Sequence, residues 1–163
     1  MGIEFNADEV IEMAEEIEAN GAAFYRKAAE LFADRDKRDL LLQLAAMEDH
    51  HLEIFRQMRK AITAKEARPS TYDPEGEAAL YIKAFADGNI FDTSVKPADR
   101  LTGDQTLSDV LGLAISIEKD SVVFYAGLRL LVPPELGRAK VEDVIAEELK
   151  HITTLNRELL SAS

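Results

Sequence analysis

Two stretches of the chain repeat each other at an offset of 100 residues, which restricts the fold to one built from two similar halves. Within each half, apolar residues recur every three or four positions, the spacing of one face of an α-helix. We therefore expect two similar helical hairpins, over about 7–66 and 106–161, related by an approximate twofold axis. The identical pairs are Val10/Val110, Ala14/Ala114, Ile17/Ile117, Glu18/Glu118, Phe24/Phe124, Tyr25/Tyr125, Arg38/Arg138, Ala46/Ala146, Glu48/Glu148 and His51/His151.

Local signals predict where the four long helices begin and end. Asn6 is suited to cap the first helix, and Thr106 or Ser108 can cap the third. The charged segment 34–37 predicts the turn of the first hairpin, and the two prolines at 133–134 predict the turn of the second.

The segment between the hairpins, 67–105, differs in composition. Pro74 predicts the start of a short helix that runs to about Ala86, and residues 90–104 are predicted to form a loop. Such a long connection is explained if the second and third helices run parallel, because the chain must then return along the length of the bundle. We predict an all-α fold with a single domain over 1–163: a four-helix bundle of two hairpins with a long crossover that contains a short extra helix.

Six polar residues interrupt the apolar faces of these helices. Carboxylates that are buried without partners cost several kcal/mol each or take up protons, and no Lys or Arg shares these faces near them. A metal cation is the natural counter-charge, and each Glu-x-x-His places both of its side chains on one helix face. The six residues are Glu18, Glu48, His51, Glu118, Glu148 and His151.

The spacing of these residues agrees with a shared metal site. Glu18 and Glu48 each lie 15 residues from position 33, so a turn there places them at similar heights in the bundle. Glu118 and Glu148 bracket Pro133 in the same way. One Glu from each of two helices, together with Glu-x-x-His from each of the other two, is a recurring ligand set for two iron or manganese ions. The alternative interpretation is that these residues form solvated faces of acidic helices.

Composition narrows the function further. The chain has 19 basic and 31 acidic residues, a net charge of −12, which disfavours nucleic acid and anionic membranes as partners. It has no cysteine, which excludes iron–sulfur clusters and thiolate zinc sites and leaves oxygen and nitrogen ligands that suit iron or manganese, with zinc possible. Because no apolar run is long enough to span a bilayer and residues 1–6 do not resemble a signal peptide, we expect a cytoplasmic protein.

Several other polar and sulfur-containing residues are weaker candidates for the metal site. Tyr25 and Tyr125 share the faces of Glu18 and Glu118, so they are expected either to donate hydrogen bonds to ligand carboxylates or to lie in the core with other partners. Glu15 is either an additional carboxylate of the site or a solvated helix residue. His50 is expected at the surface. The sulfur atoms are expected to pack in the core rather than to bind haem; they belong to Met13, Met47 and Met58.

These motifs resemble the rubrerythrin branch of the ferritin-like superfamily over 7–66 and 106–161. The resemblance implies two iron ions held by the six residues above, with Glu48 and Glu148 bridging, Glu18 and Glu118 terminal, and one histidine on each ion. It also implies a homodimer, in some relatives with helices exchanged through the long linker. The blocks that carry it are Ile17-Glu18, Phe24-Tyr25, Glu48-Asp49-His50-His51, Ile117-Glu118-Lys119-Asp120, Phe124-Tyr125 and Glu148-Leu149-Lys150-His151.

The chain departs from rubrerythrins in two ways. Rubrerythrins append a rubredoxin domain with four cysteines, and this chain has no cysteine, so an external electron donor is implied. They also carry a further ligand Glu three residues after the third-helix Glu, where this chain has Ser121; the corresponding position of the first helix is Gly21. Bacterioferritins share the ligand pattern, but Asp49 stands where they have a haem-binding Met.

The expected function is that of a non-haem di-iron oxidoreductase that reduces peroxide or dioxygen. The first alternative is iron oxidation and storage in a ferritin-like cage. The second is a metal-binding bundle without catalysis.

Overall fold

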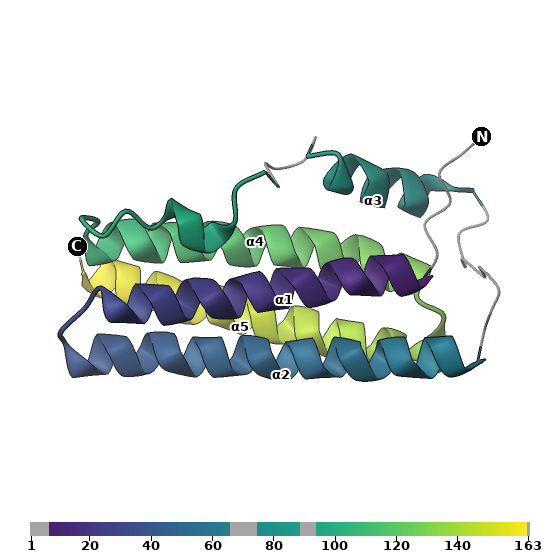
Figure 1. Cartoon of the computed structure of the whole chain (residues 1–163), viewed down its shortest axis with the longest axis horizontal. Helices are drawn as coiled ribbons and strands as arrows, with labels where there is room; N and C mark the ends of the chain where they lie inside the picture. Colours follow the sequence, from purple (N-terminus) through teal and green to yellow (C-terminus); the bar gives the residue numbers. More distant parts are fainter. Residues whose placement is uncertain (1–6, 66–74, 89–93, 163) are drawn as a thin grey trace.

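The computed structural model describes residues 7–65, 75–88 and 94–162, and its secondary structure within those ranges consists of helices joined by turns and loops (Figure 1). The elements are α1 (Ala7–Glu30), α2 (Arg35–Lys65), α3 (Glu77–Ala86), the 3₁₀-helix η1 (Pro97–Arg100), α4 (Leu107–Leu131), the 3₁₀-helix η2 (Pro134–Leu136) and α5 (Arg138–Ser161).

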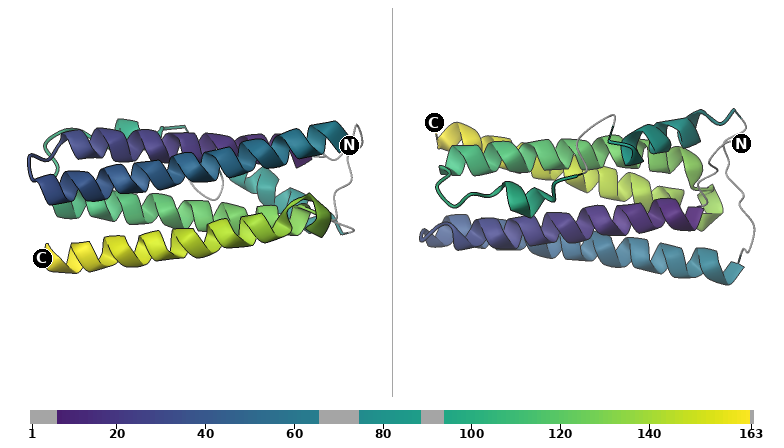
Figure 2. Two further views of the ribbon diagram at one scale, coloured as in Figure 1. Left: turned by 90° about the horizontal axis from the view of Figure 1, so that it is seen from below. Right: turned by 45° about the horizontal axis from the view of Figure 1, so that its top comes forward.

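The four long helices lie side by side along one direction (Figure 2). α1 packs mainly against α2 and α4 against α5, as two antiparallel hairpins. α2 and α4 run parallel, so the crossover leaves one end of the bundle and returns to the other (Figure 1). On that path α3 packs on α4 and η1 packs on α1. The predicted hairpins and the predicted direction of the crossover are therefore present in the structure.

The helix ends follow mostly from local chemistry. Thr106 caps α4 in a capping box, since its hydroxyl accepts from the Asp109 amide and the Asp109 carboxylate accepts from the Thr106 amide. α4 ends before Pro133, as predicted, and α5 starts after Gly137, whose φ of 111° favours glycine. The predicted cap Asn6 lies outside the described residues.

The crossover differs from the sequence prediction in two details. α3 begins at Glu77 rather than at Pro74, because Gly76 adopts a left-handed conformation with φ of 73° and sets the helix start; Pro74 itself lies outside the described residues. The segment predicted as a loop contains the short helix η1, where Pro97 occupies the first turn. Gly127 of α4 lets Tyr81 of α3 lie directly on the helix backbone, and the Tyr81 hydroxyl donates to the Val123 carbonyl.

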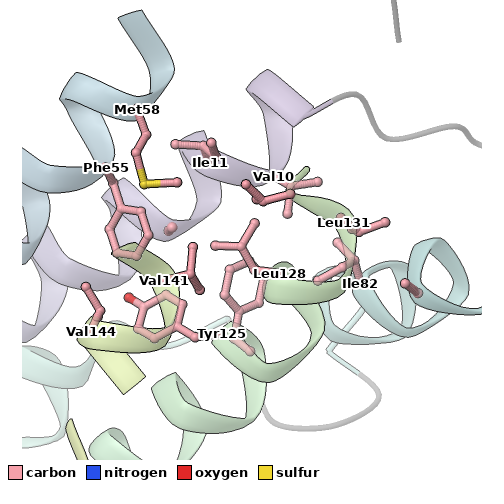
Figure 3. Packing of buried hydrophobic residues seen from close by; sticks show 14 of the residues in the cluster. Val10, Ile11, Phe55, Met58, Ile82, Tyr125, Leu128, Leu131, Val141 and Val144 are labelled. Carbon is pink, nitrogen blue, oxygen red and sulfur yellow. The ribbon is translucent and has the colours of Figure 1, made fainter. Parts of the chain in front are cut away.

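Two apolar clusters fill the bundle, one toward each end. The first joins all four long helices and α3, as Phe55, Tyr125, Val144 and Ile82 illustrate (Figure 3). The second gathers residues such as Phe24, Leu41 and Leu111 at the opposite end. A layer of buried polar residues separates the two clusters. Within the described residues, no helix is both long and apolar enough to cross a bilayer.

Candidate metal centre

The six polar residues singled out in the sequence meet at mid-height in the bundle, and each is at most 2% exposed. We refer to them as the carboxylate–imidazole layer; they are Glu18, Glu48, His51, Glu118, Glu148 and His151. The helical period explains their burial, because each lies on the apolar face of its own helix. Their burial excludes the alternative of solvated helix faces.

The layer divides into two overlapping groups of possible metal ligands. The His51 group contains Glu18, Glu48, His51 and Glu148, and the His151 group contains Glu48, Glu118, Glu148 and His151. Within each group, one nitrogen or oxygen atom per residue lies within 4.8 Å of the others. Glu48 and Glu148 belong to both groups, so they are the two carboxylates that the groups share.

Glu148 lies at the centre of the contacts in the layer. Its Oε1 is 3.0 Å from Nδ1 of His51, and its Oε2 is 2.9 Å from Nδ1 of His151. The two imidazole rings are stacked, with centroids 5.7 Å apart and an interplanar angle of 21°. Each Nδ1 therefore faces the carboxylates.

This arrangement shifts the pKa of the acidic groups in opposite directions. Burial raises the pKa of Glu18, of Glu48 and of Glu118, in the last case to about 8. For Glu148 burial also favours the neutral form, but the close contacts with His151 and His51 outweigh it and lower the pKa to about 2. Glu148 is thus held in its ionised form in the metal-free layer.

The histidines respond to the same carboxylates. Burial alone would lower the imidazole pKa, but contacts with Glu148 and Glu18 raise the pKa of His51 to about 11. Contacts with Glu118, Glu148 and Glu48 likewise raise the pKa of His151 to about 12. In the metal-free protein, two imidazolium groups are therefore the positive charges of the layer.

Two tyrosines orient the outer carboxylates. The hydroxyl of Tyr25 donates to Oε1 of Glu118, and the hydroxyl of Tyr125 donates to Oε1 of Glu18. Each bond joins α1 to α4 and so links the two hairpins. Burial and the neighbouring carboxylates raise the pKa of both tyrosines well above its usual value, which keeps them as hydrogen-bond donors.

The layer leaves several polar atoms without a hydrogen-bond partner among the described residues, although buried polar groups are nearly always paired. These atoms come from all four carboxylates and from His151. Two divalent ions would match the charge of four carboxylates and would occupy these lone pairs, so the residues fit a dinuclear centre. The atoms are Glu18 Oε2, Glu48 Oε1, Glu118 Oε2, Glu148 Oε2, and Nδ1 and Nε2 of His151.

Small residues give the layer its space. A Cβ atom placed on Gly21 would lie 2.6 Å from Oε2 of Glu48, so only glycine leaves that carboxylate where it is. The equivalent residue of α4, Ser121, is buried and donates its hydroxyl to the Ile117 carbonyl one turn earlier.

A cavity of about 430 Å³ lies between α1, α4 and the crossover. Its walls are mainly apolar, and it reaches Ile17 and Ile117, which directly precede the outer carboxylates in sequence, and also Ser121. Val95 and Pro97 line it on the crossover side. The cavity therefore lies beside the layer, on the side of α1 and α4.

The weaker sequence candidates have distinct locations. Glu15 lies outside the layer, with its carboxylate 3.7 Å from Arg59. His50 is exposed, as predicted. Met58 lies in the core, as expected, whereas Met47 is 37% exposed.

Sequence reasoning missed Glu147. Its Oε2 lies 2.7 Å from Nε2 of His51, on the side of the ring that faces away from the layer. The sequence feature that could have indicated Glu147 as a site residue is its position directly before Glu148, in a Glu-Glu-x-x-His sequence. The contact becomes evident only when α5 is placed beside α2.

The fold and the layer together define a ferritin-like helical bundle. The solved structures include one that is similar over the whole length of both chains: the crystal structure of a Thermotoga maritima protein described as a candidate ferritin-like diiron-carboxylate protein. The TM-score is 0.70 and the sequence identity is 22%, with 100% of each chain covered. No protein-family model matches the chain, and no match was found among the curated proteins.

Proposed function

We propose that this protein binds two iron or manganese ions in the carboxylate–imidazole layer and reduces peroxide or dioxygen there. The observation that carries the proposal is the set of buried carboxylate and imidazole atoms that have no hydrogen-bond partner among the described residues. The Thermotoga maritima protein, described as a diiron-carboxylate protein, supports the metal-binding part of the proposal.

Each residue of the layer has a distinct part in this proposal. Glu48 and Glu148 would bridge the ions, and each histidine would bind one ion through Nδ1. Tyr25 and Tyr125 hold the outer carboxylates in place across the two hairpins, and the apolar clusters on either side exclude water. When bound, the metal ions would supply the electrons and the Lewis acidity for reduction of the oxidant.

The electron donor is proposed to be external. The chain has no cysteine, so it lacks the thiolate ligands of a rubredoxin-type centre. We also propose a homodimer, with or without exchanged helices.

The test of the proposed function is metal content followed by turnover. Protein purified without chelators, or reloaded anaerobically with Fe²⁺, is expected to hold about two ions per chain by elemental mass spectrometry. The reduced, loaded protein is expected to consume peroxide or dioxygen with a chemical reductant. Full loading without consumption would favour a non-catalytic bundle, elution as a very large particle would favour iron storage, and failure to take up metal would refute the proposal.

Gly21→Ala is predicted to lower the metal content. The added methyl group would meet Glu48 Oε2 and displace a bridging carboxylate. The matched control is Gly112→Ala, an exposed position on α4 where a Cβ atom meets nothing within 4 Å. This control is expected to keep full metal content and to gain about 0.5–1 kcal/mol of stability, because alanine favours helix. Full metal loading of Gly21→Ala would show that the layer can bind metal without Glu48 in its present position.

A further inference from the structure

The two histidines of the layer differ at the nitrogen that faces away from the carboxylates. Nε2 of His51 lies 2.7 Å from the carboxylate of Glu147, whose side chain is 39% exposed. Nε2 of His151 is buried and has no hydrogen-bond partner in the described part of the chain. Both imidazoles therefore face Glu148 through Nδ1, but among the described residues only His51 has a carboxylate hydrogen-bonded to its Nε2.

The internal repeat accounts for this difference between the two histidines. The offset of 100 residues that aligns Glu48 with Glu148 and His51 with His151 places Met47 opposite Glu147. A thioether is only a weak acceptor and carries no charge, whereas a carboxylate accepts strongly from an imidazole N–H. Glu147 of the second hairpin supports His51 of the first. Met47, the matching residue of the first hairpin, cannot support His151 of the second in the same way.

A carboxylate behind a metal-binding histidine has known physical consequences. It fixes the tautomer and the ring orientation, and it raises the basicity of the nitrogen that binds the metal. Loss of such a partner typically weakens metal binding 10- to 100-fold. Glu147 also adds a negative charge on the side of the His51 group.

We propose that the two metal positions are unequal: the His51 group binds the first divalent ion more tightly, and the His151 group binds the second more weakly. The centre would then load in sequence, and one ion would be retained while the other exchanges more readily. Glu147 is the positioning residue that creates the difference. This inference rests on the proposed function, that is, on the layer holding two ions.

The test is an anaerobic calorimetric titration of the metal-free protein with Co²⁺, followed in parallel by visible absorption of the bound ion. The wild-type protein is expected to show two binding events that differ in affinity by at least about 10-fold. Glu147→Ala is expected to weaken the tighter event about 10- to 100-fold and to leave the weaker one unchanged. Glu147→Gln keeps a hydrogen-bond acceptor but not the charge. Its affinity in the tighter event is expected to lie between those of the wild-type protein and Glu147→Ala.

Met47→Glu tests the inference in the opposite direction. It supplies a carboxylate at the repeat position behind His151 and is expected to tighten the weaker event while leaving the tighter one unchanged. The matched control is Glu142→Ala, which removes an exposed carboxylate from the same helix as Glu147 and is expected to change neither affinity. Thermal melting of each metal-free variant checks that its fold is preserved.

The outcomes separate this inference from the proposed function. Two ions bound with equal affinity, or two unequal events that Glu147→Ala leaves unchanged, would overturn the inference and leave the dinuclear centre standing. No binding of Co²⁺ to the wild-type protein would overturn both.

Discussion

Glu148→Gln is expected to reduce the bound metal from about two ions per chain to at most about one. Glu148 is the only carboxylate of the layer that contacts Nδ1 of both histidines at 3.0 Å or less. Because those contacts hold its pKa at about 2, it is already ionised and ready to bind a cation. Glutamine has nearly the same volume but no charge, so the loss would report the charge and not the packing. Elemental mass spectrometry after anaerobic reloading with Fe²⁺ measures it.

Two further variants make this prediction decisive. Glu142→Gln, at an exposed position on the same helix, is expected to retain full loading. Glu48→Gln, at the other shared carboxylate, is expected to lose metal as Glu148→Gln does, and it provides a second measurement if one variant folds poorly. Loading of about two ions per chain in both layer variants would refute the assignment of these residues as bridging ligands.

The position of the layer could be predicted from the sequence because two periodicities agree there. The helical spacing of the apolar residues places Glu18 and Glu48 on buried faces, and the hairpin turn brings them to one height. The internal repeat then places Glu118 and Glu148 beside them. Burial of the layer follows from these patterns alone, while its role as a metal centre stays a prediction.

Details that depend on neighbouring helices could not be predicted in this way. Glu147 and Glu148 are adjacent in sequence, and only the packing of α5 against α2 shows that Glu147 contacts His51. The start of α3 depends on the backbone conformation of Gly76, which its sequence context did not reveal. The repeat also predicts equivalent environments for Glu48 and Glu148, whereas the structure shifts their pKa values in opposite directions. Symmetry in sequence therefore does not ensure symmetry in electrostatics.

The metal-free protein is expected to lose thermal stability as the pH rises from about 6.5 to 9. The two imidazoles have pKa values raised to about 11 and about 12, against 6.5 for the ordinary group. The native state therefore keeps protons that the unfolded chain releases. Their stabilising contribution is complete below pH 6.5 and is lost as the pH rises toward these native pKa values. Glu118, whose pKa is raised to about 8, also contributes stability that is lost as the pH rises from 4.5 to 8.

The size of the effect follows from proton linkage. Each retained proton contributes about 1.4 kcal/mol per pH unit, and a chain of this size shifts its Tm by roughly 2–4 °C per kcal/mol. We expect Tm to fall by at least about 5 °C between pH 7 and pH 9 in differential scanning calorimetry of the metal-free protein. His151→Gln is expected to reduce this slope markedly, and His50→Gln, at an exposed position, is expected to leave it unchanged.

Metal loading is expected to oppose this loss of stability. Ions compete with protons for the same carboxylate and imidazole atoms, so the difference in Tm between the loaded and the metal-free protein should widen as the pH rises. A metal-free Tm that stays constant or increases over pH 7 to 9 would show that the two histidines are not held as cations by the carboxylates around them. A difference in Tm that widens with pH would instead show that the carboxylates that hold protons on the histidines of the metal-free protein also bind the metal ions.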